Sequence, residues 1–269
     1  MGGAVTDLVV DRGRVFEALE ETVPRLTGLL SSLQDHRPLA VGEWTIGDVA
    51  CHLRGLFDLY VDLIEGHGPP VPRIEDVALF SDRYLIEHTE RNPAGFAKPI
   101  EAAARRFLEL ARRRPDDDPV PWYDGVQLAP SSLASVLLGE ALLHGYDMAK
   151  AGGRPWHIPA HEARVLFEGL TPVLPLYVDK EAARGLTATF EIQLRGGPRA
   201  HFIFGNGVLV VDGPKARRID LFVSAEPVTL LLVAYRRASP LTAALVGRLL
   251  AWGRKPWLAV KLPTLLRDP

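Results

Sequence analysis

Glu140 and His144 lie four residues apart in an apolar run, a spacing at which two side chains could bind one metal ion. At about 100° per residue, both fall in the middle of the apolar face of a helix, and Asp147 lies near the edge of that face. The face is formed by Leu133, Val136, Leu137 and Leu143. A carboxylate and an imidazole directed into a core are unfavourable unless something neutralises them, and a metal ion does so. A Glu–His hydrogen bond inside a helical bundle explains this pair equally well.

The helix that carries the pair has a start and an end in the sequence. Pro130 is followed by Ser131 and Ser132, and a serine hydroxyl can accept a hydrogen bond from a first-turn amide. The pair Gly152-Gly153 ends the apolar repeat. The sequence therefore predicts a long serine-capped helix that ends before these glycines.

A third candidate ligand, His52, lies in a second predicted helix. Thr45 and Asp48 stand at the spacing of a capping box, and Trp44 precedes them in the position of a hydrophobic staple. The helix should continue to about Glu65, because glycines and prolines follow. His52 lies at the margin of its apolar face and could join the Glu–His pair. Alternatively, it is a core histidine bonded to a backbone carbonyl.

Two imidazoles and one carboxylate form the ligand set of a catalytic zinc, which keeps a fourth position open, whereas structural zinc sites are usually closed by four ligands. The same ligand types would also admit iron or another divalent ion. An open position lets the metal lower the pKa of a bound water or thiol and so create a nucleophile. The sequence contains no Gly-rich phosphate loop, no Gly-x-Ser-x-Gly motif and no Cys-x-x-Cys pair.

The segments Trp44–Leu53 and Glu140–Asp147 resemble the two signature motifs of the mycothiol-dependent maleylpyruvate isomerase family, within the DinB-like metalloenzymes. This resemblance implies a four-helix bundle in which His52, Glu140 and His144 bind zinc and the thiol of mycothiol takes the open position. It also implies an enzyme whose zinc-bound thiolate adds to an electrophilic small molecule, in aromatic or natural-product metabolism. If the thiol leaves again, the reaction is a cis–trans isomerisation; if it stays, the enzyme is an S-transferase.

Two further residues are candidates for supporting roles. Arg83, between the second and third predicted helices, could anchor a substrate carboxylate. Asp147 could accept a hydrogen bond from a ligand histidine and so orient it. A surface charge at Arg83 and a packing role for Asp147 are the alternatives.

The chain divides into a helical part and a mixed part. Four main helices are expected within residues 5–151, the first of them over 5–33 with Thr6 as its cap, and a further helical stretch over 160–178. The pair Asn92-Pro93 starts a new segment, with Asn92 as cap and the proline in the first turn. After Gly185 we expect four strands, followed by apolar helices. These elements are Thr187–Leu194, Ala200–Phe204, Val208–Val211, Ile219–Ser224, Glu226–Tyr235 and Pro240–Trp252.

The tail resembles a sterol-carrier-like domain in the runs Ser224–Thr229 and Gly253–Pro256. The predicted fold class is therefore α plus α+β. A DinB-like metal-binding bundle is expected over residues 1–180, and a smaller sterol-carrier-like domain over residues 181–269.

Composition narrows the class of protein. The 269 residues are 47% hydrophobic and 24% charged, with a net charge of −2, which indicates a globular protein and gives no reason to expect nucleic acid as a partner. The sequence has no signal-peptide pattern and no uninterrupted apolar run of about 18 residues, so we expect no membrane partner. The single cysteine, Cys51, fits a reducing cytoplasm. Residues 185–269 hold 12 Lys and Arg against 5 Asp and Glu, an asymmetry that supports two domains.

We therefore expect a cytoplasmic monomer or small homo-oligomer whose partners are a low-molecular-weight thiol and an electrophilic small molecule. Two alternatives remain open at this point. One is a non-catalytic small-molecule binding protein with an apolar cavity. The other is a metal-dependent hydrolase or cyclase that uses no thiol.

Overall fold

The chain forms two units in the computed structural model, which describes residues 10–213 and 217–267. Residues 11–158 make a helical unit, and the described residues from 159 onwards belong to a unit built on a sheet. The sequence analysis assigned residues 159–180 to the helical domain, whereas their contacts group them with the sheet. The limits of the domains as independent folding units stay a prediction.

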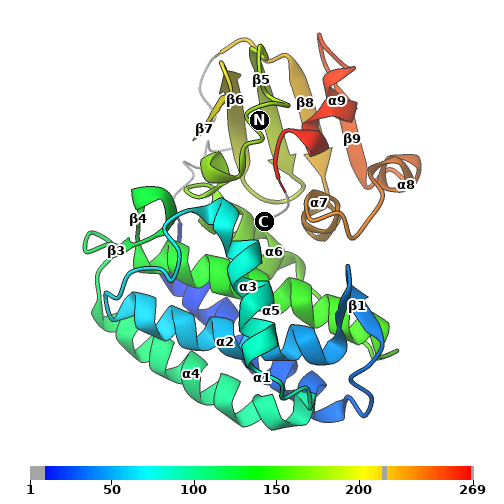
Figure 1. Cartoon of the computed structure of the whole chain (residues 1–269). Coiled ribbons are helices and arrows are strands. Elements are labelled where there is room, and N and C mark those ends of the chain that lie inside the picture. The colour runs from blue at the N-terminus through cyan, green and yellow to red at the C-terminus, as the bar shows by residue number, and fades with distance from the viewer. Residues whose placement is uncertain (1–9, 214–216, 268–269) are drawn as a thin grey trace. The chain divides into compact units, whose positions relative to one another are not determined.

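The helical unit is a bundle (Figure 1), made of four long helices and one shorter helix. The helices are α1 (Arg12–Ser32), α2 (Ile46–Ile64), α3 (Val77–Glu87), α4 (Pro93–Arg113) and α5 (Pro130–Ala151). Two small hairpins complete it, β1 (Leu39–Val41) with β2 (Trp44–Thr45) and β3 (Val120–Pro121) with β4 (Gln127–Leu128). Both α1 and α2 pack against α4 and α5, so four long helices enclose one core, with Phe57 and Phe107 among its fully buried side chains. This confirms the predicted bundle.

Two of the predicted helix starts are confirmed. The capping box at α2 is complete, because Thr45 Oγ1 accepts from the amide of Asp48 and Asp48 Oδ2 accepts from the amide of Thr45. Asn92 caps α4 with its side chain, and Pro93 occupies the first helical position. The cap of α1 is Asp11, whose carboxylate accepts from the amide of Arg14; the predicted cap at residue 6 lies outside the described residues.

The predicted serine cap of α5 is wrong. The N-cap is Ala129, which makes no side-chain hydrogen bond, and Pro130 fills the first position of the helix. The amide of Ser131 instead donates to Asp116 Oδ1, 3.0 Å away, and Ser135 donates to the carbonyl of Ser131. A carboxylate from the preceding loop thus satisfies the exposed amide that the serine was expected to satisfy.

The second unit contains a five-stranded sheet with the order β7-β6-β5-β8-β9. Its strands are β5 (Ala188–Leu194), β6 (Arg199–Gly205), β7 (Val208–Asp212), β8 (Leu221–Ala225) and β9 (Leu249–Trp252). All neighbours are antiparallel except β5 and β8, which pair in parallel and require a crossover. Alternate residues such as Phe190, Ile192 and Leu221 face the core of this unit.

The helices of this unit are α6 (Ala160–Leu170), α7 (Pro227–Ala234), α8 (Pro240–Leu245) and α9 (Leu258–Lys261), with short 3₁₀ turns at Leu174–Tyr177 and Leu262–Thr264. The helix predicted over Pro240–Trp252 is only half present, because α8 ends at Leu245 and residues 249–252 form the edge strand β9. Gly247 has φ +71°, a left-handed conformation that ends a helix, and the chain after it pairs with β8.

The predicted fold class, α plus α+β, is confirmed. None of the helices in residues 10–213 and 217–267 combines the length and apolar character needed to cross a membrane.

Candidate metal centre

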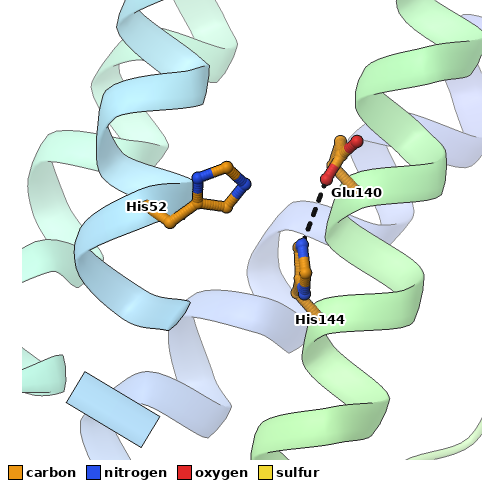
Figure 2. Close-up of side chains that lie close together, drawn as sticks. All are labelled: His52, Glu140 and His144. Atoms are coloured by element: carbon orange, nitrogen blue, oxygen red, sulfur yellow. Dashed lines mark ion pairs between the residues drawn. The ribbon is translucent and has the colours of Figure 1, made fainter. Parts of the chain in front are cut away.

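The three candidate ligands come from the two helices that face each other in the bundle, α2 and α5. The capping box fixes where α2 begins, and His52 follows within its first two turns. Glu140 and His144 lie one turn apart in the middle of α5, so they project from the same side of that helix. Helix register therefore places all three side chains in the space between α2 and α5 (Figure 2).

The structure brings one potential ligand atom from each of His52, Glu140 and His144 within 4.8 Å of one another. The Nε2 atom of His144 lies 3.2 Å from Oε2 of Glu140, and the rings of His52 and His144 are edge to face with centroids 5.3 Å apart. The side chains are half-buried: Glu140 is 30% exposed and His144 is 13% exposed. Part of the Glu140 side chain is therefore in contact with solvent, whereas His144 is more deeply buried.

His144 lies between two carboxylates. Its Nε2 atom faces Glu140, while its Nδ1 atom is buried and lies 3.4 Å from Oδ2 of Asp147, an ion-pair contact longer than a good hydrogen bond. Burial opposes the charged imidazole, but Asp147 and Glu140 outweigh it and raise the pKa of His144 to about 9. This places Asp147 where the sequence analysis expected an orienting acceptor, although that role stays a prediction.

His52 has the opposite electrostatic environment. Burial and the neighbouring His144 lower its pKa to about 3, against the smaller attraction of Glu140. Its ring also packs against Trp44, with centroids 4.8 Å apart. His52 is therefore a neutral imidazole held in place by an aromatic neighbour, which is the state in which histidine binds a metal.

Tyr123 is a neighbour of the cluster to which the sequence analysis gave no role. It is buried in the turn Tyr123–Gly125, and burial together with the charge of Glu140 raises the pKa of its phenol to about 12. Trp44 was predicted only as a helix staple, although it also packs against His52. Neither relation to the cluster could be read from helix spacing, because Trp44 and Tyr123 lie outside α2 and α5.

The donor set fits a divalent metal ion. Two imidazoles and one carboxylate are the protein ligands of many catalytic zinc sites, and such sites leave one position for water or substrate. The donor atoms also lie together in one half-buried group, as a metal site with an open position requires. The identity of the metal is not encoded in these ligand types, since they also suit iron.

Two other residues considered from the sequence lie elsewhere. Arg83 is exposed on α3, and its proposed contact with a substrate carboxylate stays a prediction. Cys51 is buried beside His52 in the chain, but its Sγ atom points to the carbonyl of His88, 3.7 Å away. Burial raises the pKa of this thiol, so it is a poor ligand and nucleophile.

Comparison with known proteins identifies a family for the helical unit. Residues 16–149 match the family model described as the mycothiol maleylpyruvate isomerase N-terminal domain. A search of curated proteins finds no significant match.

Among solved structures, the mycothiol-dependent maleylpyruvate isomerase matches with a TM-score of 0.54 at 16% identity, over 85% of this chain and 90% of that one. A mutant of that enzyme matches with a TM-score of 0.56 at 14% identity over the same shares. At these identities, the similarity establishes the fold alone.

The sheet unit has a weaker counterpart. The UbiJ-SCP2 ubiquinone synthesis protein matches 36% of this chain and 88% of that one, at 18% identity and a TM-score of 0.29. This similarity is too low to carry an argument, so the sterol-carrier-like assignment stays a prediction. The family match, by contrast, spans α2 and α5 together with His52, Glu140 and His144. Through its helical unit, the chain therefore belongs to the mycothiol maleylpyruvate isomerase N-terminal domain family.

Proposed function

We propose that this protein is a metal-dependent enzyme that uses mycothiol to attack an electrophilic small molecule. The observation that carries the proposal is the convergence of donor atoms from His52, Glu140 and His144 within 4.8 Å. Membership of the mycothiol maleylpyruvate isomerase N-terminal domain family supports the choice of thiol. The family resemblance implies zinc, and the donor set is one that zinc accepts.

The residues of the chain would hold the ion and keep its ligands in the correct state. His52 offers a neutral nitrogen, and Trp44 restricts the rotation of its ring. Asp147 faces Nδ1 of His144 and so directs Nε2 towards Glu140 and the metal position. A metal ion bound there would lower the pKa of a coordinated thiol, so that the thiolate nucleophile is available near neutral pH.

The surroundings favour chemistry on a small, partly shielded substrate. Tyr123 keeps its phenolic proton beside Glu140 throughout the neutral range, because the pKa of the phenol is raised to about 12. It can therefore donate a hydrogen bond near the cluster, but it cannot act as a base there. Arg83 as an anchor for a substrate carboxylate also belongs to this proposal, and substitution of this residue would test it.

The decisive experiment measures the metal content and the mycothiol affinity of the full-length protein, purified without chelators. We expect about one equivalent of a divalent metal and saturable thiol binding, and both should be lost in His144→Ala. A matched control is His36→Ala, because His36 is an exposed histidine of the same unit and should leave both properties unchanged. Metal-free wild-type protein that binds no mycothiol would refute the proposal and favour a binding protein.

The reaction type needs a separate measurement, because isomerisation and transfer differ in the fate of the thiol. With mycothiol and maleylpyruvate, an isomerase changes the substrate but leaves the concentration of free thiol constant. A transferase consumes one thiol for each electrophile. Turnover by metal-loaded protein in the absence of any thiol would instead support a hydrolase or cyclase.

A further inference from the structure

Tyr123 is a buried tyrosine whose hydroxyl is not used by the fold. The residue is 5% exposed, and its hydroxyl makes no hydrogen bond to any residue within 10–213 and 217–267. The indole Nε1 of the neighbouring Trp122, which is 4% exposed, is also buried without a partner in that part of the chain. Buried donors are almost always paired, and leaving one unpaired is unfavourable. The hydroxyl of Tyr123 is therefore a candidate to bond a ligand.

The backbone around Tyr123 is held from two sides. Two backbone hydrogen bonds close the hairpin of β3 and β4 over residues 122–126. Asp124 fastens this turn to the segment before α3, because its amide donates to the carbonyl of Pro72 and its Oδ2 atom accepts from the amide of Ile74. The hairpin leads directly into α5, the helix that carries two of the three candidate ligands (Figure 1). The position of the tyrosine is thus fixed relative to α5.

The ring of Tyr123 is also fixed by aromatic packing. It meets the ring of Trp122 edge to face, with centroids 4.7 Å apart. Trp122 in turn packs edge to face on Tyr60, with centroids 5.8 Å apart. Tyr60 is 3% exposed and lies on α2, about two turns after His52. Packing against α2 therefore restricts the orientation of the phenol, as a residue that must present its hydroxyl to a substrate requires.

Glu140 is the charged side chain that acts on this phenol. Burial and the carboxylate of Glu140 raise the pKa of Tyr123 to about 12, so the hydroxyl keeps its proton in the neutral range. The carboxylate does not accept that proton in a hydrogen bond, and its Oε2 atom instead faces Nε2 of His144 at 3.2 Å. The phenol therefore borders the candidate ligands with its donor available for an oxygen atom of a molecule that binds beside them.

We propose that Tyr123 is a catalytic residue that donates a hydrogen bond to the carbonyl oxygen of the electrophile. This inference rests on the proposed function, because it concerns the same site. When a thiolate adds to a carbon–carbon double bond conjugated to a carbonyl group, sulfur forms a bond to carbon and the electrons of the double bond move towards the carbonyl oxygen. Tyr123 stabilises the charge on that oxygen without giving up its proton. If the thiolate leaves again, the electrons return, so no further reactant is needed.

The test uses Tyr123→Phe, which removes the hydroxyl and keeps the ring. Acetohydroxamate, an anion that binds metal ions through oxygen, is titrated calorimetrically into the zinc-loaded full-length protein, and mycothiol is titrated separately. Tyr123→Phe should bind acetohydroxamate at least about fivefold more weakly than the wild type, whereas mycothiol, which binds through sulfur, should keep its affinity within about twofold. With an electrophile that the wild type converts, kcat should fall at least about tenfold, because a donor to the developing charge is lost.

The matched control is Tyr84→Phe, which removes a hydroxyl in the same unit from a ring of α3 that lies against Gly55. It should leave both affinities unchanged, and unchanged thermal unfolding would show that both variants are folded. Equal affinity of wild type and Tyr123→Phe for acetohydroxamate would overturn the role of Tyr123 and leave the proposed function standing. So would a metal-loaded wild type that takes no acetohydroxamate. A wild type that binds neither metal nor mycothiol would overturn both proposals.

Discussion

Gly145, the residue after His144, provides a sharp test of how α5 is held. The ring of Trp156 packs directly on the helix at this glycine. A Cβ atom at position 145 would lie 2.3 Å from Cζ2 of Trp156 and 2.7 Å from its Cε2 and Cη2 atoms, where ordinary contact begins at 3.4 Å. The ring cannot simply slide away, because its Nε1 atom donates to the carbonyl of Leu142 at 3.0 Å. Gly145→Ala must therefore displace the ring or the helix.

The expected change in the free energy of unfolding follows from three terms. Overpacking a well-filled site costs about 1–3 kcal/mol. Loss of the hydrogen bond between Trp156 and Leu142 costs about 0.5–1.5 kcal/mol. Replacing glycine by alanine inside a helix stabilises the protein by about 1 kcal/mol. The sum leads us to expect that Gly145→Ala destabilises the bundle by about 0.5–3.5 kcal/mol.

The matched control is Gly28→Ala on α1, where a Cβ atom would meet no other atom within 4 Å. There only the helix term acts, so this variant should be more stable than the wild type by up to about 1 kcal/mol. Both can be measured by urea unfolding of the full-length protein, followed by the circular dichroism of its helices. If Gly145→Ala proved as stable as Gly28→Ala, the close packing of Trp156 on α5 would be refuted.

Three further predictions concern single residues. Asp48→Asn should destabilise α2 by about 1–2 kcal/mol at neutral pH. Burial would raise the pKa of Asp48, but hydrogen bonds from Thr45 and Arg91 outweigh burial and lower it, so the stability that the carboxylate contributes is present above the usual aspartate pKa near 4 and is lost as pH falls through the lower folded value. A stability difference from the wild type that did not shrink in acid would contradict this. Asp147→Asn should weaken metal binding about 10–100-fold in a chelator competition, and unchanged affinity would exclude Asp147 as an orienting residue. Gly253→Ala should destabilise the sheet unit by more than about 2 kcal/mol, because φ is +147° and a Cβ atom would lie 2.6 Å from the carbonyl oxygen of Asp220. The control is Gly205→Ala, where a Cβ atom would have no neighbour within 4 Å; its loss of stability in thermal unfolding should be smaller, and an equal loss would contradict the prediction.

Helix starts were predictable where both partners lie within one turn of sequence. The capping box of Thr45 and Asp48 and the Asn92-Pro93 start depend only on local spacing, and the structure has both. The start of α5 depends instead on Asp116, whose carboxylate accepts a hydrogen bond from the amide of Ser131, 15 residues later in the chain. No local pattern distinguishes that arrangement from a serine cap, because the serines are present in either case.

Residues 240–252 show why tertiary pairing can override a local pattern. An apolar run of this length is compatible with a helix or with a helix followed by a strand. The backbone turns at Gly247, and β9 then obtains its hydrogen bonds from β8. Residues 249–252 form a strand because β8 offers an unpaired edge, and the sequence of residues 240–252 alone does not reveal that edge.

The candidate metal centre was also predictable only in part, because spacing within one helix is readable from the sequence but the packing of two helices is not. Spacing identified Glu140 and His144, since an i, i+4 pair is a property of one helix. The position of His52 at the margin of the apolar face of α2 made it a candidate, and the family resemblance favoured it over the alternative of a core histidine. Helix spacing could not decide this, because the approach of His52 to the pair depends on how α2 packs against α5. Trp44 and Tyr123 come from a hairpin and a turn, and only the folded chain shows that they border the cluster.

The charges around the cluster give a reason to expect a cation that is independent of ligand types. Without a metal, the carboxylates of Glu140 and Asp147 face one imidazolium at His144, while His52 is neutral, so the half-buried group carries a net negative charge. A divalent ion that displaces the proton from Nε2 of His144 would balance the two carboxylates. Because the pKa of His144 is about 9, protons compete with the metal across the neutral range, and metal affinity should rise with pH. His52 would supply its nitrogen without adding to that competition, because its pKa of about 3 leaves the imidazole neutral across the same range.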